Sequence, residues 1–114
     1  MTVFYIKGKP NPPENLQVYI SNNSVKFTWT IPVTEPSVLF VRLEVVDPQG
    51  RKEYIDSSRN YKDIQLPESS FEVNTLNPCK EYRVQARSYS STFSNITEKT
   101  FWLTGMLYSA IYII

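Results

Sequence analysis

The sequence has no histidine, one cysteine and three glycines among its 114 residues. Without histidine, the chain cannot build a Ser-His-Asp or Cys-His catalytic apparatus, and zinc sites of the usual Cys/His kind are excluded. No glycine-rich phosphate-binding loop is present, and Asp47, Asp56 and Asp63 do not have the spacing of a calcium loop. We therefore expect a chain that is not an enzyme and holds no cofactor or metal.

The lone cysteine, Cys79, means that no disulfide can close within this sequence. This is compatible with the cytosol, and equally with a secreted β-sandwich that is stabilised by its core alone. The net charge of +1 gives no electrostatic case for nucleic acid or an anionic membrane as the partner. Residues 1–25 have a short apolar run with no basic region before it, which is not the pattern of a signal peptide. This stretch therefore does not itself predict secretion.

Apolar and polar residues alternate in seven short stretches, and no stretch shows a helical period. One face of residues 24–31 carries Val25, Phe27, Trp29 and Ile31. The other six stretches are residues 14–20, 40–46, 51–57, 70–76, 82–87 and 96–103. Seven such strands, separated by turn residues, predict an all-β, seven-stranded antiparallel Greek-key sandwich.

Proline and glycine mark the boundaries of these stretches. Asp47-Pro48-Gln49-Gly50 has the residue order of a type I turn, and the prolines of residues 11–14 indicate where the domain starts. We expect an N-terminal arm over residues 1–9, one domain over residues 10–104 and an apolar tail over residues 105–114.

A corner is predicted where "LNPCKEYRVQAR" (residues 76–87) leads into a strand. A tyrosine at the head of such a strand can bury its ring and direct its hydroxyl to the upstream backbone, which fixes a crossover between two sheets. Tyr82 has this place, with Leu76 expected to fill the core beneath it and Pro78 to fix the turn. The core residues that we expect are therefore Trp29, Leu76, Pro78, Tyr82 and Val84.

These residues together resemble a fibronectin type III domain over about residues 10–104. The resemblance is carried by Pro13, Leu16 and Val18, by Val25-Lys26-Phe27-Thr28-Trp29, by Leu76-x-Pro78 and by Tyr82-x-Val84-x-Ala86. It implies an immunoglobulin-like sandwich, and a non-catalytic module that binds proteins or acts as a spacer.

The chain is similar in particular to the membrane-proximal module of cytokine receptors. In those modules Trp-Ser-x-Trp-Ser precedes the last strand, and its tryptophans interleave with arginines by cation–π stacking. Residues 93–97, Phe-Ser-Asn-Ile-Thr, occupy that place without either tryptophan. Arg83 and Arg87 occupy outward-facing positions of their strand, as such stacking requires. Phe93 is the one aromatic ring of this segment on which an arginine could stack. An ordinary lead-in to the last strand is the alternative interpretation.

The resemblance implies a receptor or cell-adhesion ectodomain on the extracellular side of the cell surface, or a secreted protein. The alternatives are a cytoplasmic structural module of a cytoskeletal or multidomain protein, and an accessory spacer domain of a secreted hydrolase. The partner would be a protein ligand or a neighbouring domain. Its contacts are expected at residues 31–37 and 88–94, which share one end of the predicted sandwich. The candidate binding residues are Pro36, Val38, Tyr89 and Phe93.

Two N-glycosylation sequons occur, at Asn22 and Asn95. Two is about the number that this composition produces by chance, so they only permit secretion. The uncharged tail is shorter than the roughly 20 apolar residues of a membrane-spanning helix. It is open to three interpretations: the start of a truncated transmembrane segment, an alternative end of the chain, or an extra strand paired with residues 2–6.

Overall fold

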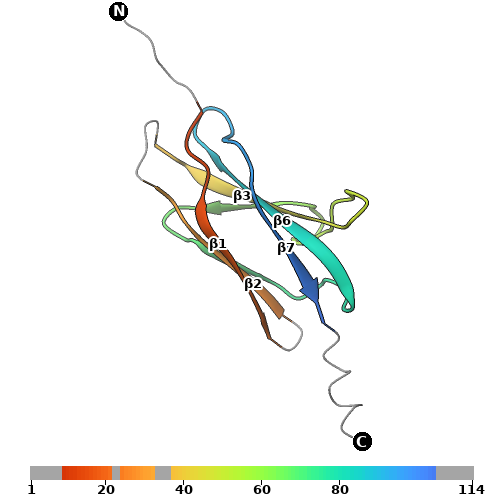
Figure 1. Cartoon of the computed structure of the whole chain (residues 1–114). Helices are drawn as coiled ribbons and strands as arrows, with labels where there is room; N and C mark the ends of the chain where they lie inside the picture. The colour runs from red at the N-terminus through yellow and green to blue at the C-terminus, as the bar shows by residue number, and fades with distance from the viewer. Residues whose placement is uncertain (1–8, 22–23, 33–36, 105–114) are drawn as a thin grey trace, which may run out of the picture.

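The computed structural model describes residues 9–21, 24–32 and 37–104, which form two antiparallel sheets packed face to face (Figure 1). One sheet has the strand order β1-β2-β5 and the other β4-β3-β6-β7. The strands of the described residues are β1 (Glu14–Ser21), β2 (Ser24–Thr30), β3 (Phe40–Val46), β4 (Lys62–Gln65), β5 (Ser70–Val73), β6 (Lys80–Tyr89) and β7 (Thr97–Leu103). The predicted all-β sandwich of seven strands is confirmed.

The fourth strand lies later in the chain than predicted. Residues 51–57 contribute only isolated bridges, whereas β4 pairs with the first half of β3. The amide of Glu53 donates to the carbonyl of Val45 at 2.8 Å, so the chain after the turn folds back along the end of β3. β4 has four residues and one buried side chain, Ile64, and this is too short for alternation to reveal it.

The turn between β3 and this return segment has the predicted form. The amide of Gly50 donates to the carbonyl of Asp47 at 2.9 Å, and Gly50 has a φ of +84°, which a residue without Cβ adopts freely. The Asp47 carboxylate accepts two further bonds, from the amides of Gln49 and Arg51, each at 2.9 Å. The side chain of Asp47 therefore satisfies backbone amides of the turn that follows it.

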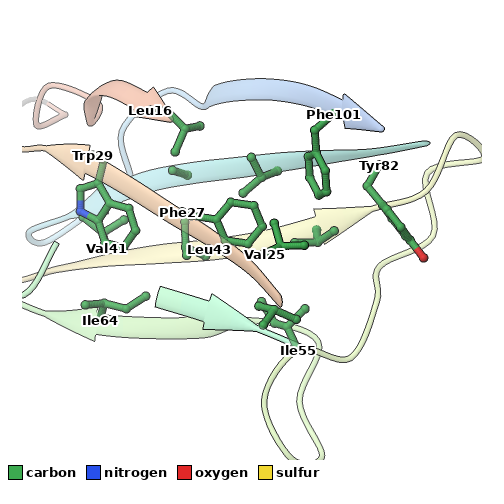
Figure 2. Close-up of a cluster of buried hydrophobic side chains, with 14 of the residues drawn as sticks. Leu16, Val25, Phe27, Trp29, Val41, Leu43, Ile55, Ile64, Tyr82 and Phe101 are labelled. Atoms are coloured by element: carbon green, nitrogen blue, oxygen red, sulfur yellow. The ribbon is translucent and has the colours of Figure 1, made fainter. Parts of the chain in front are cut away.

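The core lies between the sheets, and every strand contributes buried side chains from its inward face (Figure 2). Alternation turns Val25, Phe27 and Trp29 of β2 inward, opposite Val41 and Leu43 of β3 and their neighbours, and all of these side chains are buried. Each fully buried side chain of this size contributes about 1.5 to 3 kcal/mol by leaving water. Trp29 and Val84, both expected in the core, are among the buried residues.

The corner before β6 is pinned by Tyr82. Its ring is buried, and its hydroxyl accepts a bond from the Asn77 amide at 3.0 Å and donates one to the Asn77 carbonyl at 3.3 Å. Leu76 is partly buried and packs against the core cluster. Pro78, however, is exposed, which corrects its assignment to the core.

One end of the sandwich gathers the loops of greatest interest. β2 and β6 end there and β3 and β7 begin there, and the Leu39 amide ahead of β3 donates to the Tyr89 carbonyl at the end of β6 at 2.7 Å, next to the β6–β7 loop (residues 90–96) (Figure 1). We call this the loop end. Residues 33–36 of the other expected contact loop lie outside the described residues. Lys9 enters at the loop end, whereas Thr104 leaves at the opposite end, where the Cys79 amide bonds to the Leu103 carbonyl.

Some of the expectations fall outside the described residues. These concern the arm and tail ahead of Lys9 and beyond Thr104, the sequon at Asn22, and Pro36. Within the described ranges, the structure has no helix of the length and apolarity needed to cross a membrane.

Candidate functional site

The outer face of the four-stranded sheet carries two arginines directly opposite each other. Arg42 on β3 pairs with Arg87 on β6, and both point away from the core. Like charges at such cross-strand positions repel. The surroundings of these two side chains therefore have to compensate both positive charges.

Carboxylates from neighbouring strands supply part of this compensation. Arg42 makes a two-pronged contact with Asp63 of β4, with Nε to Oδ1 at 2.8 Å and Nη2 to Oδ2 at 3.0 Å. This charge-assisted pair raises the pKa of Arg42 above its usual value. The guanidinium therefore stays charged and is held in one orientation.

Arg87 is compensated by the buried carboxylate of Glu44. Arg87 Nη2 lies 2.9 Å from Glu44 Oε1, and Lys52 Nζ lies 2.8 Å from Oε2. Two cations therefore contact the two oxygens of this buried carboxylate, which offsets the cost of burying its charge. Glu44 is thus part of a structural ion network with Arg87 and Lys52.

An aromatic ring completes the compensation by lying over both arginines. The guanidinium carbon of Arg87 lies 4.9 Å from the centre of the Phe93 ring, and that of Arg42 lies 5.0 Å from it. The guanidinium carbon of Arg42 also lies 4.1 Å from the centre of the Tyr61 ring. We call the series Tyr61, Arg42, Phe93 and Arg87 the arginine–aromatic stack. Each such contact stabilises by about 0.5 to 2 kcal/mol, the more so when water is excluded.

The stack holds the β6–β7 loop flat on the sheet. Phe93 forms an isolated bridge with Tyr89, and the amide of Ser94 donates to the Ser88 carbonyl at 2.8 Å. The Tyr89 ring stacks on Phe40 with centroids 4.8 Å apart and lies 4.8 Å from Phe93. Aromatic side chains at the loop end thus form a continuous layer with the arginines beneath the loop.

The predicted binding residues have different places in this arrangement. Tyr89 and Phe93 come together, half-buried, in the aromatic layer. Val38 is only 8% exposed, which corrects the expectation that it offers an exposed contact. Leu39, the next residue, is instead 57% exposed, although its amide is bonded to the Tyr89 carbonyl at 2.7 Å. Leu39 is therefore an apolar side chain that the loop end presents to solvent.

The partner arginines also differ from the prediction. Arg87 contacts Phe93 as its parity suggested, but Arg83 lies 3.4 Å from Glu98 and takes no part in the stack. The second arginine is Arg42, from β3. Sequence reasoning missed it because a single arginine in an alternating strand has the pattern of an ordinary solvated residue. The register of β3 with β6 is the signal that would have found it.

Metal ligands do not gather in the part of the chain that the structure describes: no three Cys, Asp or Glu side chains come close enough to hold an ion. The charged groups of this face neutralise one another, as the pairs described above show. The arrangement can therefore present shape, rings and hydrogen bonds to a partner, and it contributes little net charge.

A two-sheet sandwich with a tyrosine-pinned corner defines a class of immunoglobulin-like β-sandwich modules. The family model of the fibronectin type III domain matches residues 11–101. The chain belongs to this family. A search of curated protein sequences found no match.

Several solved structures share the fold at low sequence identity. A two-domain fibronectin type III segment of chicken tenascin matches with a TM-score of 0.67 and 21% identity, over 82% of this chain and 49% of the tenascin segment. The fibronectin type III domain of human collagen alpha-1(XX) matches with a TM-score of 0.67 and 19% identity, over 88% of this chain and 90% of that one. A spore cortex lytic enzyme of Clostridium perfringens matches with a TM-score of 0.61 and 18% identity, over 84% of this chain and 28% of the enzyme. At such identities the likeness establishes the fold alone.

Proposed function

We propose that this domain is a non-catalytic protein-binding module in the ectodomain of a receptor or adhesion protein, and that it binds through its loop end. Fibronectin type III domains are common non-catalytic modules of receptors, adhesion proteins and other multidomain chains. The observation that carries the proposal is the exposed Leu39 beside the ordered layer of Phe40, Tyr89 and Phe93. An apolar side chain on a rigid aromatic support loses little entropy on binding, and such positions dominate the energy of protein interfaces.

The cytokine-receptor type is the form of this proposal that the stack favours. Phe93 contacts two arginines in the place where those receptors carry their tryptophan motif. This site differs from the receptor motif in two respects. One of the arginines, Arg42, comes from β3, and a single aromatic ring contacts both arginines in place of two tryptophans. A partner of this type would be a protein ligand approaching the loop end.

A photo-crosslinking amino acid at position 39 tests the binding surface. The matched control is position 19, because Tyr19 is 56% exposed but lies on the outer face of the other sheet. On cells that make the protein, we expect one specific adduct from position 39, competed by excess unmodified domain, and none from position 19. Equal labelling from both positions, or no adduct from position 39, would overturn the proposal.

A cytoplasmic structural module is the second candidate, and the exposed thiol of Cys79 favours it. Free exposed thiols persist in reducing compartments and tend to oxidise outside them. The same thiol provides the test. A membrane-impermeant maleimide added to intact cells should label Cys79 if the domain is extracellular. Labelling that appears only after the cells are opened would establish the cytoplasmic setting and exclude the ectodomain.

A further inference from the structure

Asn95 ends the β6–β7 loop, and its side chain is exposed to solvent. Its Oδ1 accepts a hydrogen bond from Lys9 Nζ at 3.0 Å. In the described part of the chain, no hydrogen bond engages its Nδ2. An N-linked glycan is attached through that nitrogen. The reacting atom therefore has no hydrogen-bond partner among the described residues.

The two residues after Asn95 complete the sequon and have defined places. Ile96 is 45% exposed. Thr97 begins β7, and its Oγ1 donates to the Pro13 carbonyl at 2.7 Å. The Thr97 hydroxyl, which the sequon requires, thus also joins β7 to the chain ahead of β1 once the protein has folded.

We propose that Asn95 is an N-glycosylation site. The proposal rests on the extracellular setting inferred above, because the donor and the transferase belong to the secretory pathway. In the reaction, the anomeric carbon of a lipid-pyrophosphate-linked oligosaccharide forms a bond to Asn95 Nδ2. The bond from that carbon to the pyrophosphate oxygen breaks, the lipid pyrophosphate leaves with the electron pair, and Nδ2 loses one proton.

The position of the glycan follows from the contacts of its neighbours. Asn95 and Thr97 contact Lys9 and Pro13, on the side of the loop end where the chain enters. Phe93 contacts the arginines on the outer face of the sheet. A sugar on Asn95 would therefore stand at the side of the loop end where the chain enters.

The test is to purify the protein from the cells that make it and release N-glycans with peptide-N-glycosidase in heavy-oxygen water. Mass spectrometry should then find residue 95 as aspartate with one heavy oxygen atom. Asn95→Gln should abolish this mark and lower the intact mass by one glycan. Thr97→Ser should retain both, since serine also completes the sequon.

Asn22→Gln is the matched control, because it removes the other sequon and should leave the mark at residue 95 intact. Recovery of residue 95 as unmodified asparagine would overturn the proposal. Maleimide labelling of Cys79 on intact cells then separates the two failures. A labelled but unglycosylated domain refutes the modification site alone, and an unlabelled one refutes the extracellular setting as well.

Discussion

At the scale of single residues, hydrogen bonds to the backbone fix two connections of the sandwich. The Tyr82 hydroxyl bonds to both the amide and the carbonyl of Asn77, and the Asp47 carboxylate bonds to the amides of Gln49 and Arg51. Tyr82 holds the corner before β6, and Asp47 holds the turn after β3. Each side chain satisfies main-chain groups that a turn leaves without a ladder partner.

Replacing Tyr82 with phenylalanine should lower the free energy of unfolding by about 1 to 3 kcal/mol, because both bonds to Asn77 are lost from a buried position. Urea denaturation measures the change. Tyr54→Phe, at an exposed tyrosine, is the control and should alter stability little. A Tyr82→Phe protein as stable as the wild type would contradict the role of the hydroxyl at the corner.

The stability difference between wild type and Tyr82→Phe should also depend on pH. Burial raises the pKa of Tyr82 above its ordinary value, so the folded state favours the neutral phenol. The contribution of this group is complete below the pKa of an unfolded tyrosine, about 10, and is lost as the pH rises through the higher folded value. The gap between the two proteins should therefore shrink in alkali. A constant gap would contradict this.

Asp47 should make the stability of the folded protein depend on pH in the acid range. The amide of Arg51, followed by that of Gln49, lowers the pKa of the Asp47 carboxyl by bonding to its charged form. The stability that this provides is present above the unfolded pKa of about 4 and is lost as the pH falls through the lower folded value. Asp47→Asn keeps an acceptor oxygen without titrating in this range. Urea titrations should show the two proteins converging in acid, and parallel curves would refute the linkage.

At the scale of elements, β6 has two functions on its two faces. Its inward residues, Tyr82, Val84 and Ala86, fill the core, while Arg87 on the outward face supports the β6–β7 loop through Phe93. Contacts with the outer face of the sheet thus hold the loop in place.

Replacing Phe93 with alanine should release this loop. The loss of contacts to Arg42 and Arg87 should lower the free energy of unfolding by about 1 to 3 kcal/mol and speed hydrogen exchange in residues 88–96. Phe93→Leu is the matched control, because it retains apolar volume without a π system. Equal behaviour of Leu and Phe at this position would show that simple packing, and not cation–π attraction, holds the loop.

The elements also show how far the sequence allowed prediction. Six strands have an alternating pattern long enough to be recognised, and the Tyr82 corner has a local signature. β4 escaped because four residues with one buried Ile64 carry almost no period. Arg42 and Val38 were misjudged because their environment depends on strand register and on neighbouring loops, which alternation within one strand does not encode.

At the scale of the whole molecule, one core joins both sheets, and Trp29 is among its largest side chains. Trp29→Ala should lower the free energy of unfolding by about 3 to 5 kcal/mol. Trp102, 55% exposed on β7, then remains as the single tryptophan. Its fluorescence, which reports on the four-stranded sheet, should change together with the far-ultraviolet circular dichroism of the entire fold. Separate transitions would show that the sheets unfold independently, and Trp29→Phe should be the milder variant.

The placement of Lys9 and Thr104 at opposite ends of the sandwich has a mechanical consequence. Tension applied through these two points runs along the strands, with β1 drawn one way and β7 the other. The hydrogen bonds that join β7 to β6 and β1 to β2 are then loaded in shear, all at the same time, and do not open one after another. Pulled at these two points, the domain is expected to resist stretching as a unit.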